Sequence, residues 1–134
     1  MAKTLRGFCI VYLSHYMNIA PADFHEELLG TLGDHQEKMI EVVGFRGSAK
    51  STFGSLALPL WAALEYPDIY PFIIPIADTG IQAGTNIANI KEELENNPLI
   101  KQDYGDIKGD FVADWTLDSE EEWQSKNMLL SNGV

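Results

Sequence analysis

The stretch "KMIEVVGFRGSAKST", residues 38–52, decides the fold that the sequence predicts. Its first seven residues are a short apolar run, rich in β-branched side chains and bounded by a glycine, which is typical of a buried β-strand. The rest, "GFRGSAKST" from Gly44 to Thr52, has the spacing of a phosphate-binding loop: Gly, four residues, Gly, Lys, then Ser or Thr. Ala49 stands where that pattern has its second glycine.

The segments that follow this loop extend the pattern. Residues 50–67 read as a helix that Pro59 kinks or restarts. Residues 70–78, "YPFIIPIAD", read as a second apolar strand, which Pro75 places at an edge or in a bulge. Residues 79–98 carry an apolar stripe typical of a helix. Strand, loop, helix, strand and helix in that order predict an α/β fold, an incomplete P-loop NTPase-type parallel sheet flanked by helices.

The part before the loop reads as helical. Residues 5–20 have apolar side chains at roughly helical spacing up to Pro21. A second helix starts with Asp23 as N-cap and Glu26 three residues later, and Gly30 or Gly33 closes it. We therefore expect one partial ATPase domain over residues 1–134, with a helical lead-in (1–37), a strand–loop–helix–strand–helix unit (38–98) and a closing part (99–134).

The closing part combines an acidic stretch with a turn signal. Residues 103–122 hold eight carboxylates without the spacing of a Ca²⁺ loop, so a solvated loop is preferred over a metal site. In "NMLLSNGV", Asn132-Gly133 follows an apolar run, which is a strong hairpin signal. The second strand of that hairpin would begin where the sequence stops, and this suggests a chain cut from something longer.

Charge and composition narrow the classes of function. The formal charge of −11 over 134 residues argues against a nucleic-acid-binding surface, which needs Lys and Arg. The single cysteine, Cys9, excludes a disulfide within the chain and is expected to be a buried small hydrophobe. No apolar run approaches the length of a bilayer span, and the N-terminus lacks the cleavage site of a signal peptide.

The loop chemistry explains why these residue types point to a polyphosphate. Backbone N–H groups of a tight glycine-rich turn face the β-phosphate, and the following helix adds the positive end of its dipole. Lys50 would reach the phosphates and the Ser51 hydroxyl would bind Mg²⁺. Ala49 is tolerable if its backbone has a helix-like φ. The alternative is a plain strand-to-helix turn with its lysine in solvent.

Arg46 is an additional cation within the loop. It could stabilise charge that develops in phosphoryl transfer, as an arginine finger does. An ion pair with the acidic surface is an equal alternative for this side chain.

With these residues in view, the chain resembles the N-terminal part of the ATPase domain of a phage large terminase subunit, the motor that packages DNA. The resemblance covers nearly the whole chain. It rests on "FHEELL", "GFRGSAKST", "WAALE", "IADTGIQAGTNIANIKEELENNPLI" and the closing "LLSNGV". Loops of that family often carry an arginine and tolerate a replaced glycine.

The resemblance implies an ATP site and its residues. The residues expected to hold the ATP phosphates and Mg²⁺ are Gly44, Phe45, Arg46, Gly47, Ser48, Ala49, Lys50, Ser51 and Thr52, with Lys50 and Arg46 in the catalytic roles. Gln36 is a weak candidate for reading adenine. Asp78 and Thr79 match a recurring "DT" of the family, but we prefer a helix N-cap for them.

The resemblance also implies partners and a setting. Full-length members act on double-stranded DNA with a small terminase subunit and a portal, in the cytoplasm of a bacterial host, encoded by a phage or prophage. This acidic chain is not expected to bind DNA itself or a membrane.

Two parts of the family pattern are missing. No apolar strand ends in Asp-Glu, the motif that holds Mg²⁺ and orients water, and the nuclease domain is absent from this sequence. We therefore expect ATP binding without efficient hydrolysis. The alternatives are a fragment of another P-loop NTPase or kinase, and an inactive prophage remnant that acts only as a protein-interaction module. The three histidines form no metal-binding pattern, because "HEELL" lacks the second His of a zinc helix.

Overall fold

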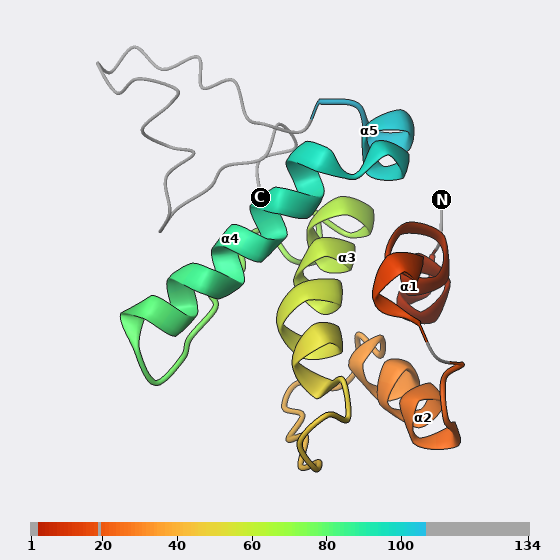
Figure 1. Cartoon of the computed structure of the whole chain (residues 1–134), viewed down its shortest axis with the longest axis vertical. Coiled ribbons are helices and arrows are strands. Elements are labelled where there is room, and N and C mark those ends of the chain that lie inside the picture. Colours follow the sequence, from red (N-terminus) through yellow and green to blue (C-terminus); the bar gives the residue numbers. More distant parts are fainter. Residues whose placement is uncertain (1–2, 19, 107–134) are drawn as a thin grey trace. The chain divides into compact units, whose positions relative to one another are not determined.

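The computed structural model describes residues 3–18 and 20–106, and every regular element in these ranges is a helix (Figure 1). The predicted α/β class is therefore wrong for the described part of the chain, which contains no β-strand and no sheet. The predicted hairpin and most of the acidic stretch lie outside the described residues. The chain divides into two compact units, Met1–Trp61 and Ala62–Val134.

The first unit is built from α1 (Leu5–Tyr12), a 3-10 turn η1 (Ser14–Tyr16), α2 (Asp23–Leu32) and η2 (Thr52–Ala57). Helix α1 packs against both α2 and η2. The side chains at their interfaces are apolar and buried: Leu5, Phe8, Cys9, Tyr12, Leu13, Leu29, Leu32, Phe53, Leu56 and Ala57. Leu5, Phe8, Cys9, Tyr12 and Leu13 belong to the stripe that apolar spacing over residues 5–20 predicts. The α-helix is shorter than predicted, because it ends at Tyr12, and Tyr16 is exposed.

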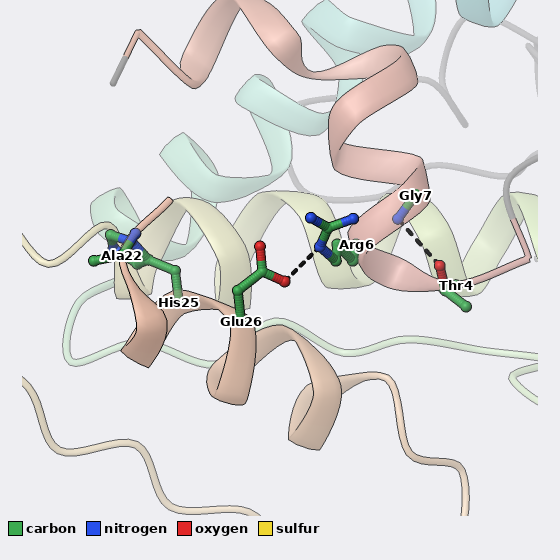
Figure 2. A network of polar contacts seen from close by, with 6 residues as sticks. All are labelled: Thr4, Arg6, Gly7, Ala22, His25 and Glu26. Carbon is green, nitrogen blue, oxygen red and sulfur yellow. Dashed lines mark hydrogen bonds and ion pairs between the residues drawn. The ribbon is translucent and has the colours of Figure 1, made fainter. Parts of the chain in front are cut away.

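Polar contacts fix the starts of these helices and hold them together. Thr4 caps α1, because its hydroxyl accepts a hydrogen bond from the Gly7 N–H at 3.1 Å. The guanidinium of Arg6 on α1 pairs with the Glu26 carboxylate on α2, as Figure 2 shows. This hydrogen bond and the charge of Glu26 raise the pKa of Arg6 above its ordinary value.

Helix α2 begins one residue away from the predicted cap. Ala22 is the N-cap and Asp23 is the first helical residue. Its carboxylate still lies in the first turn, where the helix dipole favours negative charge. Gly33 ends the helix as the C-cap.

The helix after the loop runs without a break from residue 50 to residue 65, although it contains Pro59. Its middle, η2, is a π-helix, and α3 (Leu58–Glu65) follows, crossing the boundary between the two units. A proline inside an α-helix removes one hydrogen bond and clashes with the carbonyl four residues earlier. The π-helix places the Leu58 N–H on the Phe53 carbonyl, five residues back. This wider turn just before Pro59 gives its ring room without ending the helix.

The second unit contains α4 (Gly80–Asn96) and α5 (Pro98–Tyr104), which pack on each other. Asn97 lies between them, and its side-chain oxygen accepts hydrogen bonds from the N–H groups of Leu99 and Ile100. Its amide also donates to the Glu93 carboxylate at 2.8 Å. An Asn cap followed by proline at the first helical position is a helix-start signal. A helix over Pro98–Tyr104 was nevertheless not predicted.

The two segments predicted as buried strands have no regular secondary structure and carry no strand ladder within the described residues. In the first, Met39 is 91% exposed and Val43 is 88% exposed. In the second, Ile74 is 66% exposed and Ile76 is 87% exposed. A β-strand is stable only when a neighbouring strand takes up its backbone hydrogen bonds, and an apolar sequence alone does not provide that neighbour.

Candidate phosphate-binding site

The loop between the first apolar segment and the helix is a tight turn. The Ser48 N–H donates to the Phe45 carbonyl at 3.3 Å, which closes the turn around Arg46 and Gly47. Gly47 has a φ of 86°, in the region that only glycine adopts without strain. The Ala49 carbonyl accepts from the Phe53 N–H at 3.0 Å, so helical hydrogen bonding begins directly after the turn.

Ala49 is held in a left-handed conformation with a φ of 57°. The condition under which alanine would be tolerated here without strain, a helix-like φ, is therefore not met. The phosphate-loop pattern has its second glycine here, and the positive φ gives a physical reason for that preference. An alanine in this region costs about 1 kcal/mol relative to a right-handed conformation, because its Cβ approaches the carbonyl oxygen of the same residue.

Gly44 is required for a different reason, a close approach of side chain to backbone. A Cβ built on Gly44 would lie 3.0 Å from the Ser48 hydroxyl and 3.6 Å from the Lys50 side chain. Ser48 is only 4% exposed, and its hydroxyl has no hydrogen-bond partner in the described part of the chain. Gly44 and Ser48 thus lie close together at the base of the loop, and the buried Ser48 hydroxyl can still form a hydrogen bond with a ligand.

Lys50 folds back over the turn. Its ammonium donates to the Phe45 carbonyl at 3.0 Å, so the charge lies above the loop that it follows in sequence. Lys50 is also the first residue of the helix. The first N–H groups of a helix have no carbonyl one turn earlier to bind, and they carry the positive end of the helix dipole. Lys50 therefore brings a cation to the part of the chain where the helix offers its first backbone donors.

A hollow of about 500 Å³ opens beside this point within the first unit. Phe24, Glu27, Leu28 and Thr31 of α2 line one side. Residues 40–45, together with Ser48 and Lys50, line the other. This volume is in the range of small-molecule sites, and the mixture of apolar walls with a few polar groups is typical of them.

His25 connects α2 to the loop, and sequence reasoning did not identify it. Its Nδ1 accepts a hydrogen bond from the Ala22 N–H at 3.0 Å, and its Nε2 donates to the Ser48 carbonyl at 3.1 Å. The imidazole lies 3.9 Å from the ring of Phe24 and 5.5 Å from the ring of Phe53. The only signal in the sequence is its position three residues after the N-cap, where Glu or Gln usually reaches back.

The other predicted loop residues are more exposed. Arg46 is exposed and forms no ion pair within the described residues, so the surface ion pair considered for it is not present there. Ser51 is exposed in the first helical turn, and Thr52 is half-buried. Phe45 is 66% exposed, and its ring meets Phe24 edge-on at 5.8 Å.

Three further candidates are not residues of this loop. Gln36 is exposed and is not among the residues that line the hollow. Asp78 is exposed, and Thr79 caps α4 through a hydrogen bond from the Gln82 N–H at 3.2 Å, as preferred for this pair. Both lie in the second unit.

Cys9 and the other two histidines lie outside this site. Burial raises the pKa of the Cys9 thiol to about 12, which keeps it neutral and unreactive. The ring of His35 stacks on Trp61 at 5.2 Å, and His15 is exposed next to Tyr16. Within residues 3–18 and 20–106, no three His, Cys, Asp or Glu side chains are grouped so as to hold a metal ion. None of the helices described is long and apolar enough to span a membrane.

Comparison with known proteins gives no match of any kind: no family model, no curated protein and no solved structure is significantly similar to this chain.

Proposed function

We propose that this chain binds ATP, with the phosphates held by the loop from Gly44 to Thr52. The observation that carries the proposal is the form of the turn. Positive φ angles at Gly47 and Ala49 curl the backbone, and the curl ends at a helix start with the Lys50 ammonium folded over it. A phosphate group needs such a set of donors: backbone N–H groups, a helix N-terminus and one cation.

Five features of the loop fit a phosphate ligand and its Mg²⁺ ion. Gly44 leaves room that a Cβ would fill, and Ser48 has a buried hydroxyl without a partner in the described residues. Lys50 bonds a neutral carbonyl, which is a weaker acceptor than a phosphate oxygen. Arg46 is exposed on the turn and would add a second positive charge close to the ligand. Ser51, exposed in the first helical turn, would hold the Mg²⁺ that accompanies ATP.

The nucleoside would occupy the neighbouring hollow. Its apolar walls, Phe24 and Leu28, suit an aromatic base, since π-faces and apolar side chains pack well together. Glu27, Glu41 and Thr31 on the same lining could accept hydrogen bonds from ribose hydroxyls or an exocyclic amino group.

The resemblance to a phage large terminase subunit gives this binding a biological setting. In that setting the chain is the ATP-binding part of a DNA-packaging motor in a bacterial host cell. DNA, the small terminase subunit and the portal would then be partners of the assembled motor. The proposal concerns ATP binding and not turnover.

A titration with ATP, with and without Mg²⁺, tests the proposal by calorimetry. Lys50→Ala should weaken binding at least tenfold, because a hydrogen bond to a charged group is worth about 1.5–3 kcal/mol. Lys101→Ala removes an exposed cation from α5 and is the matched control, with unchanged affinity expected. Inorganic tripolyphosphate should compete with ATP, since the loop recognises phosphates. Equal affinities for the wild type and Lys50→Ala would exclude the phosphate-loop assignment.

A further inference from the structure

We infer that His25 is a positioning residue for this loop: it holds the Ser48–Ala49 peptide in the orientation that phosphate binding needs. The inference rests on the proposed function and adds a residue outside the loop to the site. It is carried by the two hydrogen bonds of the imidazole, one to each side, and by the ring contacts that fix it.

The partners of the imidazole define its tautomer. Ala22 offers an N–H to Nδ1, and a backbone N–H can only donate. Ser48 offers a carbonyl to Nε2, and a carbonyl can only accept. The neutral form with its proton on Nε2 satisfies both contacts at once. His25 therefore joins the first turn of α2 to the loop through one rigid ring.

The ring has little freedom to leave this position. His25 is half-buried, with Phe24 at 3.9 Å and Phe53 at 5.5 Å between ring centres. Phe53 is only 5% exposed and belongs to the helix that follows the loop. The imidazole thus contacts the loop, the helix before it and the helix after it.

Fixing the Ser48 carbonyl also fixes the next amide. In a trans peptide, the C=O and the following N–H point in opposite directions, and the described chain contains no cis peptide. Because the Ser48 carbonyl points towards His25, the Ala49 N–H points away from α2. That N–H is one of the donors available at the start of the helix.

The same contact explains how Ala49 stays in its strained conformation. A non-glycine residue at a φ of 57° persists only where the surrounding structure holds it. The peptide before Ala49 is held by His25 through the Ser48 carbonyl, and the carbonyl of Ala49 is held by the Phe53 N–H at 3.0 Å. Without His25, one of these two restraints is lost, and the Ser48–Ala49 peptide can rotate.

Two substitutions of His25 separate its hydrogen bonds from its packing. His25→Gln keeps both bonds, because the Gln oxygen can accept from Ala22 while its nitrogen donates to Ser48. His25→Phe keeps the aromatic packing and loses both bonds. His15→Gln, at an exposed position of η1, is the control for replacing a histidine elsewhere in the first unit.

The first measurement is the affinity of each variant for ATP and for tripolyphosphate, with folding checked by circular dichroism. We expect His25→Phe to bind both ligands three- to tenfold more weakly, the effect of one ordinary hydrogen bond, and His25→Gln to stay within about twofold of the wild type. If the wild type binds ATP and a folded His25→Phe binds equally tightly, the inference is wrong. It is also wrong if His25→Gln loses as much affinity as His25→Phe.

The second measurement needs no ligand and keeps the inference separate from the proposed function. Nitrogen-15 NMR should find the His25 proton on Nε2, and His25→Phe should shift the amide signals of Gly47 to Lys50 while His25→Gln restores them. A proton on Nδ1, or unshifted loop amides in His25→Phe, would overturn the inference. A wild type with the expected NMR signature but without ATP binding would instead refute the proposed function, and the role of His25 in phosphate binding with it.

Discussion

The loop from Gly44 to Ala49 and the apolar segment just before it, residues 39–43, are neighbours with opposite kinds of order. The loop is held by two local contacts, a turn hydrogen bond and the Lys50 ammonium, and by one contact distant in sequence, from the His25 imidazole. The segment before it has no ladder in the described part of the chain, and Val43 is 88% exposed.

The difference between these regions lies in where their partners come from. A turn is completed by residues three to five positions away, so a local sequence is sufficient to form it. An extended segment needs a second strand that lies elsewhere in sequence or structure. The second apolar segment, residues 70–77, behaves like the first, since Ile74 and Ile76 are also exposed.

The largest expected effect compares a buried isoleucine with an exposed one and tests whether the apolar segments lie outside the core. Ile100 is fully buried in α5, and Ile100→Ala should cost about 2–5 kcal/mol of unfolding free energy. Ile76 is 87% exposed, and Ile76→Ala should change the free energy of unfolding by less than about 0.5 kcal/mol. Urea denaturation of both variants gives these values. A cost above about 1.5 kcal/mol for Ile76→Ala would mean that the segment is packed in a core.

The next effect concerns the buried thiol of α1 and depends on pH. The pKa of Cys9 is raised from 9.0 to about 12, so the folded state keeps the proton in a range where the unfolded state loses it. The free energy of unfolding should be unaffected by this group below pH 9. It should fall by about 1.4 kcal/mol per pH unit between pH 9 and pH 12.

Urea denaturation of the wild type and Cys9→Ala across this range isolates the thiol from lysines and tyrosines, which titrate in both proteins. The wild type should lose stability with a steeper slope than the variant. Equal slopes would mean that Cys9 is not packed in the helical core.

The smallest effect tests the strain in the loop. Ala49→Gly should stabilise the chain by about 0.5–1 kcal/mol, because glycine adopts a positive φ without a Cβ clash. Ala88 is exposed within α4, and Ala88→Gly is the matched control, which should destabilise by about 1 kcal/mol. Thermal unfolding of the two variants should therefore shift in opposite directions. A lower melting temperature for Ala49→Gly would contradict the left-handed conformation.

The helices were the predictable part of this fold. Apolar spacing located α1 and α4, cap signals located α2, and the Thr79 cap of α4 follows from its residue type. These signals are reliable because a helix makes its backbone hydrogen bonds within itself and needs its neighbours only for one face. The strands were predicted from composition alone. The β-branched, apolar residues of Met39–Val43 favour a strand, but they do not supply the neighbouring strand that a sheet needs.

The sequence by itself determined the turn at Gly47, the caps at Thr4 and Thr79, and the position of Lys50 at the start of a helix. Each of these depends on residues within one or two turns of chain. Only the tertiary structure decided that the apolar segments stay exposed, that Ala49 is left-handed, and that His25 reaches the Ser48 carbonyl 23 positions away. Contacts between residues distant in sequence depend on how helices pack, and no local pattern encodes them.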